Sequence, residues 1–205
     1  MTAPSLRRDA AENRRRLLEA AAHVFAEHGL DASVEDVARQ AGVGMGTLYR
    51  RFPTKEALIS ELVRQLITDL VAVANEALTL NDGTGLEKVL YRTGEINASH
   101  RGCLTRLWRD YDTRALSEEF RAAVSELLER AKKRNRIRFD VTATDIDLVF
   151  WSIRGVIQMT RGVTDVGWRR HLAIVLAGLR PDREALGEDP LAESDIQRIR
   201  DLDTR

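Results

Sequence analysis

The chain has 205 residues, about 43% of them hydrophobic, which is enough for one large domain or for a small domain beside a medium one. No apolar run approaches the ~18 residues of a transmembrane helix, and the charged N-terminus has no apolar core, so neither a membrane span nor a signal peptide is predicted. Lys plus Arg and Asp plus Glu both number 32, and the zero net charge argues against a protein that is basic throughout. Cys103 is the only cysteine, which excludes an intrachain disulfide and fits a reducing cytosol.

The charges are unevenly distributed along the chain. Residues 1–16 contain five arginines, whereas residues 181–205 contain eight acids and four bases. We expect residues 1–12 to form a flexible basic arm, because a terminus without apolar anchors is usually mobile. A helix is then predicted over about residues 13–28, with Gly29 placed to end it. Its apolar residues recur at helical spacing, at Leu18, Ala22 and Phe25.

Two short helices are predicted between Ser33 and Phe52, joined by a tight turn at Gly42. Ser33 is a suitable N-cap for the first of them, and Asp36 three residues later resembles a capping box. Pro53 ends the second helix. Two short helices joined by a glycine-containing turn have the mechanics of a helix-turn-helix, whose second helix enters the major groove of DNA.

The side chains of the second short helix suit contacts with DNA. Arg50 can pair with guanine or phosphate, Thr47 can touch a phosphate or a thymine methyl, and Tyr49 can reach a phosphate. Lys55, at the start of the next helix, can meet a phosphate. The predicted DNA-binding residues are Ser33, Met45, Gly46, Thr47, Tyr49, Arg50, Arg51 and Lys55. By spacing alone, a plain three-helix packing unit with Tyr49 in its core and solvated arginines is an equal alternative.

The rest of the chain also reads as helices, and no strand pattern is found. Proline is absent from residue 54 to residue 180, which favours long helices. Helices are predicted at about residues 55–80, 86–100, 102–112, 117–133, 142–161 and 168–179, with Thr142 or Thr144 capping the fifth. The predicted fold is therefore all-α. A DNA-binding domain over residues 13–53 precedes a larger helical domain over residues 54–180 and an acidic tail over residues 181–205.

The last two predicted helices are apolar on more than one side. In the first of them, one stripe consists of Ile146, Val149, Phe150, Ile153 and Ile157, and another of Leu148, Trp151, Gly155 and Met159. Such helices are buried on more than one side, either in a monomer core or against a second copy of the chain. Small residues favour the dimer, and these are Gly155, Ala173, Ala177 and Gly178.

A small-molecule pocket is predicted in the helical domain. Residues 101–111 mix aromatic, apolar and polar side chains, a mixture that suits a concave ligand site, although core packing is the commoner meaning of such a stripe. The predicted lining is His100, Leu104, Trp108, Tyr111, Phe150, Trp151 and Arg154. Arg154, within an apolar helix, needs an acidic partner or an anionic ligand unless it faces water at the helix edge. The basic run over residues 132–138 is interpreted as a helix C-terminus rather than a second DNA site.

Two other classes of function were weighed. An enzyme is disfavoured, because no HExxH, CxxC, P-loop or GxSxG motif is present and the four histidines are scattered. We therefore expect no catalytic residues, no cofactor and no metal site. A plain helical interaction module would not need the caps and arginines that residues 33–55 contain.

The stretch from Gly42 to Leu58, GVGMGTLYRRFPTKEAL, resembles the signature of the TetR family of repressors. LEAA at residues 18–21, FAEHG at residues 25–29 and VARQA at residues 37–41 resemble the same family, so the likeness covers about residues 13–60. It implies an all-α homodimer with an N-terminal DNA-binding domain and a larger ligand-binding and dimerisation domain. It also implies DNA contacts at Thr47, Tyr49, Arg50 and Lys55.

The same resemblance implies a cytoplasmic, ligand-responsive repressor that binds a palindromic operator and is released by a small molecule, with activation as the alternative. Two residues depart from the family pattern. Many members have Ser or Thr where this chain has Gly44, and a basic or polar residue where it has Met45. Base recognition is therefore expected to rest on Arg50 and on Arg7 and Arg8 of the arm, which can enter the minor groove or simply belong to a solubilising tail.

Overall fold

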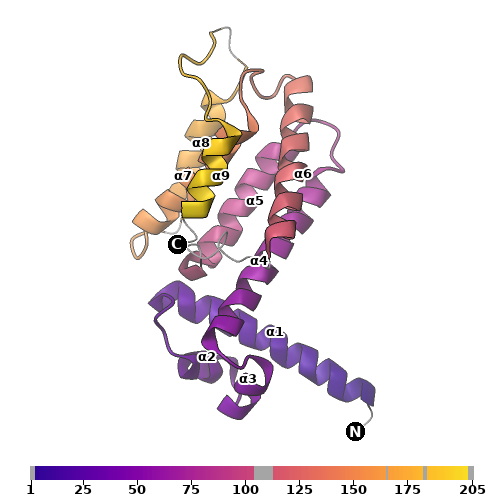
Figure 1. Cartoon of the computed structure of the whole chain (residues 1–205), viewed down its shortest axis with the longest axis vertical. Helices are drawn as coiled ribbons and strands as arrows, with labels where there is room; N and C mark the ends of the chain where they lie inside the picture. Colours follow the sequence, from indigo (N-terminus) through magenta and orange to yellow (C-terminus); the bar gives the residue numbers. More distant parts are fainter. Residues whose placement is uncertain (1–2, 104–112, 165, 182–183, 203–205) are drawn as a thin grey trace. The chain divides into compact units, whose positions relative to one another are not determined.

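The structure, a computed structural model, describes residues 3–103, 113–164, 166–181 and 184–202, and every regular element in these ranges is a helix (Figure 1). The prediction of an all-α fold is confirmed. The chain divides into two compact units, an N-terminal unit of residues 1–65 and 99–107 and a C-terminal unit of residues 66–98 and 108–205. In the described part of the chain, no helix has both the length and the apolar character needed to cross a membrane.

The N-terminal unit is built from α1 (Ala3–His28), α2 (Val34–Ala41), α3 (Met45–Arg51), the beginning of α4 (Lys55–Ala77) and the 3-10 helix η1 (Arg101–Cys103). Helix α1 packs against both α2 and η1. The core of the unit is formed by buried apolar side chains of these elements, among them Leu17, Phe25, Val37, Leu48 and Leu58.

Helix α1 begins ten residues earlier than the sequence predicted. The prediction started the helix at residue 13, whereas the backbone is helical from Ala3. Pro4 lies in the first turn, where its missing N–H breaks no helical hydrogen bond. Good helix formers follow it without a break until Gly29, whose φ of 78° ends the helix. The absence of apolar anchors was therefore not sufficient reason to place residues 3–12 outside the helix.

The C-terminal unit contains the rest of α4, then α5 (Gly85–Ser99), α6 (Arg114–Lys133), α7 (Ala143–Met159), α8 (Gly167–Gly178) and α9 (Glu193–Leu202). Helix α8 packs on α7, and its Trp168 also lies against α5. A Cβ at Gly94 of α5 would be 2.2 Å from Cζ3 of Trp168, so only glycine admits the indole there. The core of this unit includes Leu70, Leu90, Phe120, Leu127, Ile146, Ile153 and Leu172.

The structure shows where α6 and α7 begin, and it differs in detail from the prediction. Thr142, rather than Thr144, caps α7, and it forms a reciprocal capping box with Asp145. Helix α6 begins at Arg114, so Ser117 lies inside its first turn and donates a hydrogen bond to the carbonyl of Thr113. Of the helix predicted over residues 102–112, residues 104–112 lie outside the described part of the chain.

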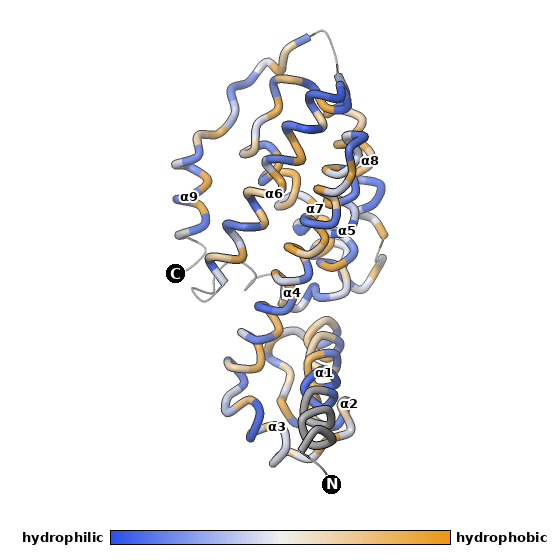
Figure 2. Tube along the Cα trace, turned by 90° about the vertical axis from the view of Figure 1, so that its right-hand side faces the viewer, coloured by the Kyte–Doolittle hydropathy of each residue, from blue (hydrophilic) through white to orange (hydrophobic). Residues whose placement is uncertain are grey.

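The acidic tail is ordered where it is described. Helix α9 is a mostly hydrophilic segment in the hydropathy view (Figure 2), yet its Ile196 is fully buried and α9 packs on α7. A second attachment lies in the loop between α6 and α7, where the buried Arg138 pairs with Asp140 at 2.7 Å and also donates to the carbonyl of Glu184. Asp140 in turn accepts the backbone N–H of Leu186 at 2.9 Å.

Candidate DNA-binding site and ligand cleft

Helix α2 begins at the N-cap that the sequence predicted. The hydroxyl of Ser33 accepts the backbone N–H of Asp36 at 3.1 Å and donates to the carboxylate of Asp36 at 2.7 Å. Hydrogen bonding from Ser33, together with the ion pair to Arg39, lowers the pKa of Asp36. Ser33 was also predicted to contact DNA, but its hydroxyl is engaged by its own helix and lies beside a carboxylate, which repels phosphate.

The turn between α2 and α3 depends on Gly42. Its φ of 67° and ψ of 34° are left-handed, and its N–H and that of Val43 cap the carbonyls of Arg39 and Ala38. Gly44 then provides the N-cap of α3 by its extended backbone alone, with no side-chain hydrogen bond. The turn is therefore fixed by local backbone hydrogen bonds and by the left-handed conformation of Gly42.

Helix α3 is anchored on one side and exposed on the other. Leu48 is fully buried and holds the helix to the unit, whereas Met45 and Thr47 are half-buried. The remaining predicted contact residues of α3 are exposed, and these are Gly46, Tyr49, Arg50 and Arg51. Tyr49 has 46% of its surface exposed, which removes the alternative that it belongs to the core.

The exposed side of α3 continues into the start of α4. Arg50 donates to the hydroxyl of Thr47 at a long 3.4 Å, so the guanidinium lies along the helix surface over Thr47. Thr54 caps α4 by accepting the N–H of Ala57 at 3.0 Å, and Lys55 is the first residue of that helix. The arrangement presents a guanidinium, a phenol and an ammonium beside a helix N-terminus, a set of donors suited to phosphate and base edges.

The predicted ligand-binding residues are not all brought together. Phe150 and Trp151 line a cleft between α6, α7 and α9. His100 follows α5, with its Nδ1 atom 3.0 Å from the hydroxyl of Ser99, and the half-buried Arg154 lies on α7; neither is among the residues that line the cleft. Three other predicted residues, Leu104, Trp108 and Tyr111, lie outside the described residues.

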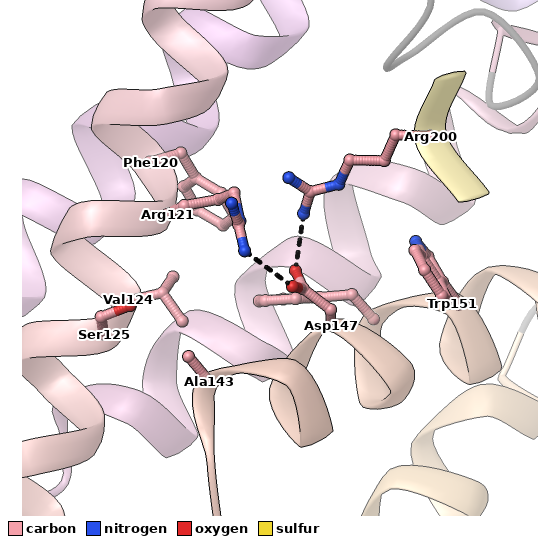
Figure 3. A pocket seen from close by; sticks show the side chains of 9 residues that line it. Phe120, Arg121, Val124, Ser125, Ala143, Asp147, Trp151 and Arg200 are labelled. Carbon is pink, nitrogen blue, oxygen red and sulfur yellow. Dashed lines mark hydrogen bonds and ion pairs between the residues drawn. The ribbon is translucent and has the colours of Figure 1, made fainter. Parts of the chain in front are cut away.

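The cleft has about 460 Å³ of empty space, part of it open to solvent. Its lining combines apolar side chains, which we call its floor, with the charged groups of Arg121, Asp147 and Arg200 (Figure 3). The rings of Phe120 and Phe150 pack at 5.6 Å in the floor. Asp147 of α7 accepts from Nη2 of Arg121 at 3.1 Å and from Nη2 of Arg200 at 2.9 Å. Glu193, at the start of α9, accepts from the same Nη2 of Arg121 at 2.7 Å.

Burial controls the electrostatics of this cluster. The side chain of Asp147 is only 12% exposed, and burial raises its pKa although two guanidinium groups oppose the shift. Burial also lowers the pKa of Arg200. Arg121, Asp147 and Arg200 were not predicted from the sequence, although an aspartate inside the apolar α7 helix indicates that a cationic partner lies nearby.

Helices α7 and α8 also expose an apolar surface. Large apolar side chains are exposed at Leu148, Met159 and Ile174, and no neighbouring atom lies within 4 Å of a Cβ built at Gly155 or Gly178. Ala173 and Ala177 are exposed on α8 as well. We call these seven residues the α7–α8 face. By contrast, the basic run over residues 132–138 includes cations with local partners, such as Lys132 with Glu129 at 2.9 Å.

Comparison with known proteins gives concordant matches. The family model described as bacterial regulatory proteins, tetR family, matches residues 17–62. The HTH-type transcriptional repressor KstR2 of Rhodococcus jostii is 32% identical over 187 residues, covering 81% of this chain and 90% of that protein. The crystal structure of the TetR transcriptional regulator SCO0520 from Streptomyces coelicolor superposes with a TM-score of 0.63 at 32% identity, over 82% of this chain and 98% of the other. A TetR regulatory protein from Mycobacterium vanbaalenii gives a TM-score of 0.64 at 30% identity, over 85% and 99%.

Proposed function

Because this chain belongs to the TetR family of bacterial regulatory proteins, and is thus a helix-turn-helix transcriptional repressor rather than an enzyme, we propose that it binds a palindromic operator as a homodimer and leaves it when a small molecule binds. We infer that it acts in the bacterial cytoplasm, as TetR-family regulators do. The relative from Rhodococcus jostii is named a repressor, which supports repression over activation.

The observation that carries the proposal is the exposed side of α3. Tyr49 and Arg50 point away from a helix that Leu48 fixes to the core, so their presentation to DNA needs no rearrangement. Arg50 supplies the base contact, since a guanidinium forms two parallel hydrogen bonds to guanine. Thr47, Tyr49, Arg51 and Lys55 hold the phosphates, and Met45 and Gly46 lie against base edges at the start of the helix.

The α7–α8 face supports the proposed homodimer. Its exposed Leu148, Met159 and Ile174 would otherwise remain in water, and its glycines and alanines allow helices of a second copy to approach closely. A twofold dimer repeats the same surface and presents two copies of α3. The two copies read half-sites about 34–36 Å apart, or a multiple of that distance. The effector then favours a spacing of the two reading helices that misses successive grooves.

A gel-shift titration with the DNA that flanks the coding region tests the proposal, at stated salt concentration. Wild-type protein should bind this DNA in preference to unrelated DNA. Arg50→Ala and Tyr49→Ala should each weaken specific binding by about tenfold or more, as expected for one lost base or phosphate contact. Arg114→Ala, which removes an exposed arginine of the C-terminal unit, is the matched control and should bind normally.

Equal binding by the Arg50, Tyr49 and control variants would refute the assignment of α3 as the reading helix. The absence of sequence-selective binding by the wild type would refute the proposed function itself. A reporter gene placed behind the bound DNA separates the two signs of regulation, since deletion of the regulator should raise expression from a repressed promoter.

A further inference from the structure

The charges around the cleft of α6, α7 and α9 do not balance within its interior. Two guanidinium groups, from Arg121 and Arg200, share the single buried carboxylate of Asp147, which leaves one positive charge in excess. Among the residues that the structure describes, Glu193 offsets it, and the side chain of Glu193 is 60% exposed at the rim. An exposed ion pair contributes about 1 kcal/mol or less, so this partner is easily replaced.

The guanidinium groups of the two arginines also have further N–H donors. Each guanidinium carries five N–H groups, and in the described part of the chain both residues use only Nη2, Arg121 toward Asp147 and Glu193 and Arg200 toward Asp147 alone. Asp147 lies between the two groups and draws both toward the same point (Figure 3). A second anion at the rim would therefore find Nε and Nη1 donors from two different helices.

The floor of the cleft sets the shape of the rest of the ligand. Phe120, Val124 and Phe150 supply apolar surface below the arginines, and the half-buried Trp151 adds an aromatic edge. Aromatic walls bind flat apolar bodies well, and an ionised group bound to arginine orients such a body.

We propose that this cleft binds an organic anion with a flat apolar body, whose negative group displaces Glu193 and is held by Arg121 and Arg200. The inference rests on the proposed function in one respect, namely that this anion is the effector. Because α9 contributes Arg200 and Glu193, the ligand replaces a bond that attaches the first turn of α9 to α6. The C-terminal helix is thus part of the binding site and not an appendage.

Two fluorescent probes test this inference on the full chain. Anilinonaphthalene sulfonate has a flat apolar body with a sulfonate, and phenylnaphthylamine is the same body without the charge. The sulfonate should bind the wild type saturably. Arg121→Gln and Arg200→Gln should each weaken sulfonate binding about tenfold, as expected for a lost charged hydrogen bond, while phenylnaphthylamine binding should not change. Arg198→Gln removes a neighbouring arginine of α9 that pairs with Asp195, and it should bind like the wild type.

A variant of Glu193 provides a second test, in which the expected result is tighter binding and so cannot arise from unfolding. Glu193→Gln removes the competitor and should tighten sulfonate binding by roughly two- to fivefold, the range expected for an exposed ion pair. Asp195→Asn removes another acid from the first turn of α9 and should have no effect. Sulfonate affinity that is unchanged in all variants, or an equal loss for both probes, would overturn the inference. Since no DNA is present, these outcomes are independent of the gel-shift result, which tests the proposed function.

Discussion

Gly102 lies against the backbone of Phe25, so that a Cβ at position 102 would be only 1.9 Å from the carbonyl oxygen of Phe25. The contact brings η1, which follows α5 in the sequence, into the unit that contains the helix-turn-helix. Nearby, the guanidinium of Arg101 donates to the carbonyl of Ala26 at 3.2 Å. The residues that follow α5 are therefore packed directly on α1.

Gly102→Ala should destabilise the N-terminal unit by about 1–3 kcal/mol or more, because the clash is with backbone that cannot rotate away. Urea unfolding followed by circular dichroism measures the effect. Gly187→Ala is the control, since no atom lies within 4 Å of a Cβ at that position. Equal midpoints for the two variants would show that α1 and η1 do not pack as closely as described.

Replacing Gly44 should raise the stability of the protein rather than lower it. It caps α3 without a side-chain hydrogen bond, and a Cβ there would meet no atom within 4 Å. Gly44→Ser should therefore stabilise the protein by about a few tenths of a kcal/mol, because serine is a somewhat better N-cap than glycine. It should also tighten operator binding, since the added hydroxyl lies at the N-terminus of the reading helix. Gly44→Ala separates the two effects, because alanine adds a Cβ without a hydroxyl. If the alanine and serine variants bound DNA equally well, the serine hydroxyl would not contact a phosphate.

The helix-turn-helix could be predicted because its signals act over a few residues. Ser33, Gly42 and Pro53 each fix a helix end through their own backbone or side chain, and the structure places these ends as expected. The start of α1 was misplaced because the arm was predicted from its lack of apolar anchors, whereas local helix propensity carries the helix back to Ala3. Thr142 and Thr144 were indistinguishable by propensity, and only the bond to Asp145 decides between them.

The ligand cleft could not be predicted in the same way, because its key contacts join distant residues. Arg200 and Asp147 are 53 positions apart, and Arg121 and Glu193 are 72 apart. No local sequence pattern links such residues. The tail that contains Arg200 also has too few apolar residues to predict a packed helix. Ile196 is nevertheless completely buried, and Glu193 and Arg200 of the same helix form ion pairs with Arg121 and Asp147.

The α7–α8 face predicts a change of oligomeric state. If the proposed dimer forms through this face, Ile174→Glu should yield a monomer and lower operator affinity at least about tenfold, because burying an unpaired carboxylate between two copies costs several kcal/mol. Phe139→Glu is the matched control, since Phe139 is an apolar residue 77% exposed on the loop before α7, compared with 58% for Ile174. Light scattering after size exclusion gives the mass of each variant. An Ile174→Glu protein that stays dimeric would place the interface elsewhere.

The attachment of the tail at Asp140 predicts a pH dependence. The hydrogen bond from Arg138, followed by that from the N–H of Leu186, lowers the pKa of Asp140 from 3.8 to about 2. A carboxyl whose pKa is lower in the folded protein binds fewer protons when folded, so its stabilising effect is complete above pH 4 and disappears as the pH falls toward 2. The difference in Tm between the wild type and Asp140→Asn should therefore be constant from neutral pH down to about pH 4 and then shrink. Glu188→Gln, which alters an exposed acid of the same tail, should show no such difference. A Tm difference for Asp140→Asn that persists unchanged at pH 2 would mean that the ionised carboxylate is not what binds Arg138 and the tail.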